Sequence, residues 1–165
     1  MVCRAWRGER AQGRDLILHM GTAQYKIWQP KIWIVLAAIA GASGVALGAY
    51  ISHGLGFITP DDAREAARAS LQSAVLYQLL HALALLGVGI WAQVSGGGRV
   101  LAAAGTLLTL GIVLFCGLIY ARHLAGFDGL RAFVPWGGGC FILGWICVGI
   151  SAFCGAKPEN DSKAP

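Results

Sequence analysis

The polar residues best placed to do chemistry lie inside an otherwise apolar stretch of the sequence. Tyr77, Gln78 and His81 interrupt a run of apolar side chains from 71 to 94. A helix places all three on one side, because residues three and four positions apart are neighbours on a helical surface. Polar groups in an apolar medium are costly without partners. These side chains therefore have one of two roles: they relay protons or bind a lipophilic ligand, or they form hydrogen bonds that join helices.

Two further polar residues belong to neighbouring apolar stretches. His53 ends the first stretch and Tyr120 closes the third. If consecutive stretches cross a membrane in alternating directions, both residues enter the same half of it as Tyr77 and Gln78. We expect His81 to bond to Gln78, to Tyr120 or to a backbone carbonyl beside the first-stretch glycines. The candidate intramembrane cluster consists of His53, Tyr77, Gln78, His81 and Tyr120.

The chain lacks the motifs of common enzyme and metal sites. It has no glycine-rich phosphate-binding loop between a strand and a helix, and no nucleophile elbow. The four apolar stretches contain no acidic residue. Its cysteines show neither a CxxC pair nor a Cys/His ligand spacing. We therefore expect a protein that is not an enzyme and that carries no cofactor and no metal.

The apolar stretches predict four transmembrane helices. Each is long enough to cross a hydrocarbon core of about 30 Å, and aromatic residues such as Trp33 near their ends are typical of membrane interfaces. We expect an all-α integral membrane protein, an antiparallel four-helix bundle over 32–154, with the lipid bilayer as its surroundings. The expected spans are 32–51, 71–94, 100–121 and 133–154, between a basic arm at 1–31 and a polar tail at 155–165.

The connection between the first two spans carries a helix-start signal. Thr59 is a suitable cap, Pro60 suits the first helical position, and Asp61 and Asp62 suit the positive end of a helix dipole. We expect a polar helix that begins here and either bends into the second span or continues as that span.

Small residues recur at helical spacing in the first and fourth spans. In the fourth span the pattern Gly137, Cys140, Gly144, Cys147 and Ser151 alternates three and four positions. Such stripes let helices approach closely, within the bundle or against a second copy or another membrane protein. The expected helix-packing residues are Gly41, Gly44, Gly48, Gly137 and Gly144.

The net charge of +5 indicates an orientation in the membrane rather than binding to nucleic acid, because 6 of the 13 basic residues precede the first span. Cytoplasmic flanks of spans are enriched in Lys and Arg. Both termini are therefore predicted to be cytoplasmic, with nine basic residues inside and four outside, and no nucleic-acid partner is expected. Met20 is an alternative start, and without residues 1–19 the bias falls to five against four.

Several blocks of the sequence resemble the domain-of-unknown-function 423 family, which includes bacterial inner-membrane proteins of the YgdD type and the eukaryotic transmembrane protein 256 group. The blocks are Gly-Ala-Tyr-Ile-Ser-His-Gly-Leu at 48–55, Tyr-Gln-Leu-Leu-His-Ala-Leu-Ala-Leu-Leu at 77–86, Phe-Cys-Gly-Leu-Ile-Tyr at 115–120, Pro-Trp-Gly-Gly at 135–138 and Leu-Gly-Trp at 143–145. The resemblance implies a four-span protein of a bacterial inner membrane, without an established activity or cofactor.

Two functions therefore stay open. The first is a non-enzymatic membrane component, either a packing subunit or an assembly factor of a larger complex. The second is a carrier or binder of a lipophilic small molecule, a quinone or a lipid, built around His81.

Overall fold

Four long apolar helices make up most of the chain. The computed structural model describes residues 31–127 and 129–153, and in that part the four helices long and apolar enough to cross a membrane are Lys31–His53, Asp61–Ser95, Arg99–Ala125 and Arg131–Phe153. Residues 1–30 of the expected arm, including Met20, lie outside the described residues, as do the expected tail and Cys154 at the end of the fourth expected span. Large apolar side chains such as Val35, Leu83 and Ile142 are exposed on the outside of the bundle, as a lipid environment requires.

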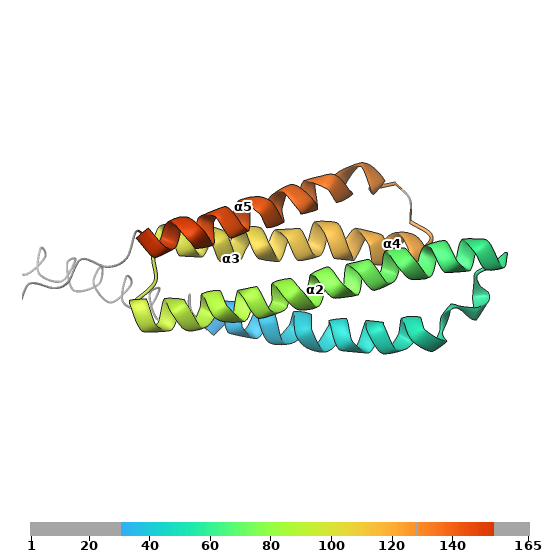
Figure 1. The fold of residues 1–165 in the computed structure, drawn as a ribbon, viewed down its shortest axis with the longest axis horizontal. Helices are drawn as coiled ribbons and strands as arrows, with labels where there is room; N and C mark the ends of the chain where they lie inside the picture. The colour runs from blue at the N-terminus through green and yellow to red at the C-terminus, as the bar shows by residue number, and fades with distance from the viewer. Residues whose placement is uncertain (1–30, 128, 154–165) are drawn as a thin grey trace, which may run out of the picture.

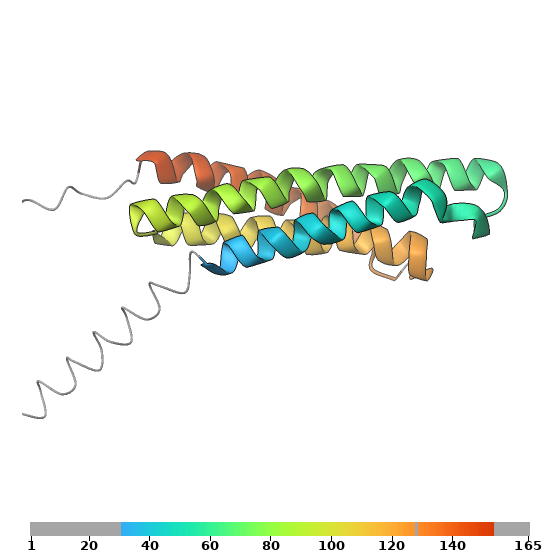
Figure 2. The same ribbon diagram turned by 90° about the horizontal axis from the view of Figure 1, so that it is seen from below.

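The second helix, α2, runs without a break over Asp61–Ser95, so the polar helix expected after Pro60 and the second span are one element. At about 1.5 Å per residue, its 35 residues are long enough to extend well beyond a core of about 30 Å. Figures 1 and 2 show α2 and its connection to the first helix reaching past the end of α4.

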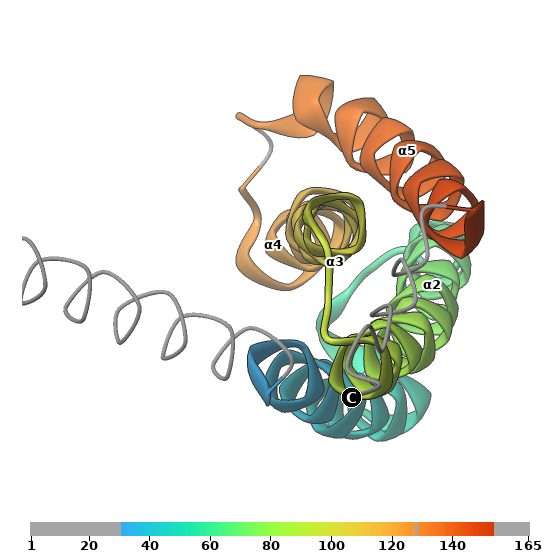
Figure 3. The same cartoon turned by 90° about the vertical axis from the view of Figure 1, so that its left-hand side faces the viewer.

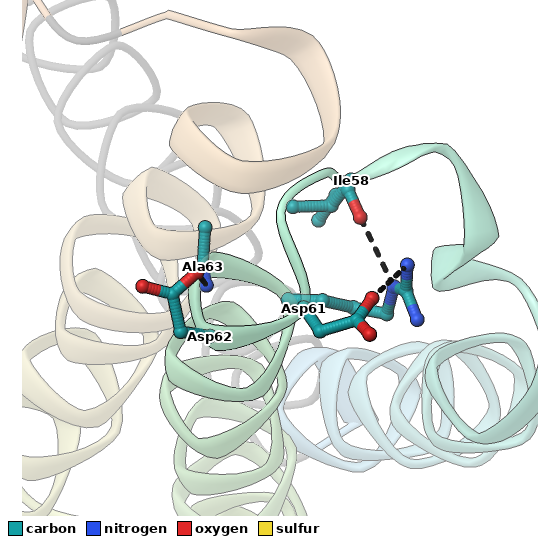
Figure 4. Close-up of polar contacts among 5 residues, drawn as sticks. Ile58, Asp61, Asp62 and Ala63 are labelled. Carbon is teal, nitrogen blue, oxygen red and sulfur yellow. Dashed lines mark hydrogen bonds and ion pairs between the residues drawn. The ribbon is translucent and has the colours of Figure 1, made fainter.

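The start of α2 differs from the expected cap. Pro60 occupies the position before the helix and no side chain caps it, so the expected role of Thr59 is wrong. The acids instead act from the first turn: Asp62 Oδ1 accepts from the Ala63 amide at 2.9 Å, and Asp61 lies 2.8 Å from the Arg64 guanidinium. Arg64 Nε donates to the Ile58 carbonyl at 3.0 Å, which ties the connection to the helix (Figure 4).

The third helix changes its winding midway. It consists of α3 (Arg99–Gly111), a π-helical segment η2 (Ile112–Gly117) and α4 (Leu118–Ala125). A π-helix hydrogen-bonds five residues apart instead of four, is rare, and is often found at functional positions. It was not expected from the sequence, whose apolar pattern is the same on both sides of the segment.

The helices traverse the bundle in alternating directions, and residues 31 and 153 lie at the same end of it (Figure 1). A connection of only three glycines, 96–98, forces α2 and α3 to be neighbours. Gly96 and Gly97 take positive φ angles of 75° and 76° there, which other residues rarely adopt. Seen from one end, the first helix, α2 and α5 lie in an arc around α3 and α4 (Figure 3).

The core consists of large side chains seated against glycines. Trp33, expected at the interface, is buried, and a Cβ at Gly105 would lie 2.7 Å from its indole ring. In the first helix, a Cβ at Gly44 would lie 2.9 Å from Leu79, and one at Gly48 would make an ordinary contact with Val75 at 3.4 Å. Gly41 differs from its expected packing role, because no atom lies within 4 Å of a Cβ built there.

The fourth span, comprising η3 (Arg131–Phe133) and α5 (Val134–Phe153), packs through a different seam from the expected one. Gly137 and Gly144 are buried and touch the third helix, as part of the predicted stripe. Between them lies Phe141 rather than Cys140, which is only half-buried like Cys147. The reason is Gly111, which leaves room on α3 for the Phe141 ring. The seam is Gly137, Phe141, Gly144, Val148 and Ser151.

Candidate functional site

The polar residues of α2 face two different neighbours. Gln78 and His81 are buried, with exposed fractions of 4% and 6%, whereas Tyr77 is 44% exposed. Gln78 faces the first helix. His81 and Tyr77 face α5 and the π-helical segment. The single cluster expected from the sequence is therefore divided between the two sides of α2.

Gln78 joins α2 to the first helix. Its Nε2 donates to the Ala40 carbonyl at 2.8 Å and to the Ser43 hydroxyl at 2.9 Å. The Ser43 hydroxyl in turn donates a hydrogen bond to the Ile39 carbonyl at 2.8 Å. Gly44 lies beside this link, and a Cβ there would make an ordinary contact with Gln78 Nε2 at 3.4 Å. Both amide protons of Gln78 are used inside the protein.

His81 joins α2 to α5. Its Nδ1 lies 2.7 Å from the Tyr77 carbonyl, and because a carbonyl only accepts, Nδ1 carries the proton. Nε2 of the neutral ring then accepts from the Trp145 indole N–H, at the longer distance of 3.3 Å. Both ring nitrogens of His81 therefore have partners.

His81 belongs to a cluster of aromatic rings from α2, η2 and α5. Its ring stacks on Phe141 of α5 with centroids 3.6 Å apart and planes inclined by 19°. Tyr77 packs on Phe115 of η2 with centroids 5.1 Å apart. Aromatic pairs with centroids about 4.5–7 Å apart, such as Tyr77 and Phe115, add about 0.5–1.5 kcal/mol beyond the area that they bury. We call Tyr77, His81, Phe115, Phe141 and Trp145 the aromatic cluster.

The expected partners of His81 are wrong. Neither Gln78 nor Tyr120 bonds to it, and the carbonyl that it meets belongs to its own helix. Sequence reasoning missed Phe141 and Trp145, which repeat on α5 the four-residue spacing of Tyr77 and His81 on α2. That shared spacing was the signal available, since two helices crossing a membrane side by side present such pairs to each other.

The other two members of the expected cluster lie elsewhere. His53 is exposed at the end of the first helix. Tyr120 packs beside the apolar group of Ile51, Leu55 and Leu71. Its hydroxyl oxygen is buried and has no hydrogen-bond partner among the described residues.

Replacing Tyr120 by Phe should leave the stability unchanged or raise it by about 1 kcal/mol. A buried hydroxyl without a partner costs about 1–3 kcal/mol relative to a satisfied one, and Phe keeps the ring that packs on the core. Thermal unfolding of the purified protein in detergent measures the change. A loss above about 1 kcal/mol would show that the hydroxyl has a partner, such as a buried water.

Few polar groups of the aromatic cluster are free to take part in chemistry, because those of His81 already form hydrogen bonds within the protein. His81 holds its proton toward a backbone carbonyl and its lone pair toward an indole N–H. Over residues 31–127 and 129–153, no three His, Cys, Asp or Glu side chains come together as a metal-binding group. What the contacts do is connect helices: Gln78 to the first, and His81 to the fourth.

Four apolar helices with polar contacts between them define a small multi-pass membrane protein. Residues 47–138 match the model of the family described as "Protein of unknown function (DUF423)". The chain belongs to this family, as the resemblance of its sequence blocks implied.

Relatives with membrane-protein names cover most of the chain. The UPF0382 membrane protein YwdK of Bacillus subtilis is 35% identical over 122 residues, which is 74% of this chain and 96% of the relative. SH2409 of Staphylococcus haemolyticus is 36% identical, with 74% and 96% covered. A UPF0382 membrane protein of Haemophilus influenzae is 31% identical, with 73% and 93% covered. No solved structure matches the chain.

Proposed function

We propose that the protein is a non-enzymatic membrane component, a packing or assembly subunit rather than a catalyst. The observation that carries this proposal is that the buried polar side chains of α2 bond to other spans: Gln78 to Ala40 and Ser43, and His81 to Trp145. Side chains that form their hydrogen bonds with neighbouring helices fix the positions of those helices relative to one another. They are not held ready for a substrate.

The exposed face of the first helix is suited to contact with a helix of a partner protein. Ala38, Ala42 and Ala46 are exposed and lie four positions apart, so they form one row of small side chains. Beside this row an apolar cavity of about 390 Å³ is lined by Gly41, Leu83 and neighbouring residues of the first helix and α2. Small residues in rows let transmembrane helices approach closely. The partner helix comes from a second copy or from another membrane protein.

A second candidate function is the binding of a lipophilic molecule, a quinone or a lipid, at the aromatic cluster. Tyr77 and Trp145 are about half exposed at the edge of the cluster, so a ligand in the bilayer can reach them from the side. The π-helical segment that supplies Phe115 also favours this candidate, because such segments are frequent at functional sites.

Changing His81 to Gln separates the two functions. Under the structural proposal the variant stays folded and loses about 1 kcal/mol, because interhelical hydrogen bonds in membranes average about 0.6 kcal/mol and an aromatic pair adds about 0.5–1.5 kcal/mol. Wild type and variant are purified in mild detergent, and extracts are analysed by mass spectrometry. We expect no small lipophilic molecule whose amount depends on His81, and a polypeptide partner or second copy at the same ratio in both.

One quinone-like molecule per wild-type chain, absent from a folded His81→Gln variant, would refute the structural proposal and establish the binder. The aromatic neighbour supplies a control. Trp145→Phe removes the indole donor but keeps a ring, so it is expected to lower stability by less than about 1 kcal/mol.

We further propose that the protein resides in the bacterial inner membrane with both termini in the cytoplasm. The support is the bias of nine basic residues against four. The four basic residues predicted to lie outside belong to the ends of helices at the other end of the bundle from residues 31 and 153: Arg64 and Arg68 near the start of α2, Arg122 in the last turn of α4 and Arg131 in η3. A C-terminal fluorescent fusion should therefore glow, and a C-terminal alkaline phosphatase fusion should be inactive. An active phosphatase with a dark fluorescent fusion would reverse the orientation.

A further inference from the structure

A second cavity lies at the end of the bundle farthest from residues 31 and 153. It has a volume of about 310 Å³ and lies between the end of α4, the start of the fourth span and Ser70 of α2. Three basic side chains line it: Arg122 and His123 in the last turn of α4, and Arg131 at the start of η3. None of the polar residues of the aromatic cluster contributes to it.

The cavity is amphipathic. Leu118, Ile119 and Val134 supply apolar walls from the membrane-spanning helices, while the two arginines supply hydrogen-bond donors and His123 and Ser70 add polar side chains. None of the acids of the described chain lines it. Basic side chains at a helix C-terminus also favour the helix dipole, which accounts for Arg122 and His123. It does not account for Arg131, which begins the next element.

The depth of the cavity places it at the lipid headgroups. Arg122 and His123 end one membrane span and Arg131 begins the next. Exposed aromatic side chains lie beside it, including Phe127, Phe133 and Trp136, of which Trp136 is 70% exposed. Tryptophan and basic residues at the ends of spans are typical of the interface between hydrocarbon and water.

We propose that this cavity binds the phosphate-bearing headgroup of an anionic phospholipid. Arginine holds phosphate oxygens by paired, charge-assisted hydrogen bonds, and the apolar walls accept the beginning of the acyl chains. The volume is at the lower end of the range of about 300–1,000 Å³ for small-molecule pockets, which suits a headgroup. Arg122 and His123 also interact within the protein, so the lipid shares them, and Arg131 is the residue to change.

The test is competition between two lipids for the full-length protein in mild detergent. Phosphatidylglycerol and phosphatidylcholine with identical acyl chains are added in equal amounts, and native mass spectrometry counts the lipids retained per chain. We expect one phosphatidylglycerol to be retained in several-fold preference. Arg131→Gln should remove most of this preference and bring the retention of the two lipids close to equal, whereas Arg131→Lys should retain part of it.

Arg68→Gln is the matched control. Arg68 lies at the same end of the bundle on α2, two positions before Ser70, and does not line the cavity. Its variant has the same net charge as Arg131→Gln and should keep the preference. Equal retention of both lipids by wild type, or equal loss in the two variants, would overturn the proposal.

Inorganic phosphate distinguishes a lipid site from a site for a free anion. Phosphate alone should displace little phosphatidylglycerol, because it cannot use the apolar walls; efficient displacement would overturn the assignment to a lipid. Thermal unfolding of each variant without added lipid checks the fold. This outcome is independent of the His81 experiment, because the two sites share no residue.

Discussion

Changing Gln78 to Glu should destabilise the protein by about 3 kcal/mol at neutral pH. The substitution keeps the shape of the side chain but replaces the donor that faces the Ala40 carbonyl at 2.8 Å with an acceptor. An ionised carboxylate at the centre of a transmembrane helix costs about 2.5–3.5 kcal/mol, and here it also faces a carbonyl oxygen. Denaturation of the purified protein in mixed detergent micelles measures the loss.

The pH dependence of this variant identifies the cause. A protonated carboxyl group can donate to Ala40 again, so the deficit should shrink as the pH falls from 8 toward about 5, nearer the ordinary range of glutamate. Gln72→Glu is the control, because Gln72 is exposed on the same helix at the beginning of the expected span 71–94, away from the membrane centre where a charge costs most, and its loss should stay below about 1 kcal/mol. Equal losses in the two variants, or a deficit independent of pH, would contradict the assignment of Gln78 as the link to the first helix.

The second large effect is expected at Gly137, where α5 lies against the backbone of the π-helical segment. A Cβ built at Gly137 would overlap the Phe115 amide nitrogen, and it would lie 2.8 Å from Phe115 Cβ. Neither atom belongs to a flexible side-chain end, so the helices themselves must separate. Overpacking of this kind costs about 1–3 kcal/mol, and Gly137→Ala should lose about 2 kcal/mol in thermal unfolding.

The neighbouring glycine provides a control of opposite sign. A Cβ at Gly138 would meet no atom within 4 Å, and alanine is favoured over glycine in a helix by about 1 kcal/mol. Gly138→Ala should therefore keep or raise the stability. If both variants behave alike, the close approach of α5 to η2 does not determine the fold.

The spans and the family were predictable because they depend on local sequence. A stretch of about 20 apolar residues without charge is sufficient to indicate a membrane helix, and all four stretches lie in helices that meet this criterion. The start of α2 at Asp61 also follows from nearby residues, since the acids of the first turn favour a helix there.

The rotation of each helix about its axis was not predictable in the same way. A seam of alternating three- and four-residue steps through Gly137 and Gly144 can pass through Cys140 or through Phe141. The choice depends on Gly111 of another helix, which makes room for the larger ring. Similarly, the position of His81 along α2 indicates its depth, but its partner depends on which side of α5 faces it, and that side carries Trp145.

The π-helical segment Ile112–Gly117 sets the angular relation between the two halves of the third span. It holds one residue more than an α-helical turn would, and one residue corresponds to about 100° of rotation and 1.5 Å of rise. A one-residue deletion within 112–117 that restored regular α-helix would turn α4 by about that angle relative to α3. Arg122 and His123 would leave the cavity that they line with Arg131, and Tyr120 would leave the core, while α3 kept its contacts with α5. These six residues thus set the rotation of α4 about the helix axis relative to α3. One continuous helix can therefore turn different sides toward the interior at its two ends.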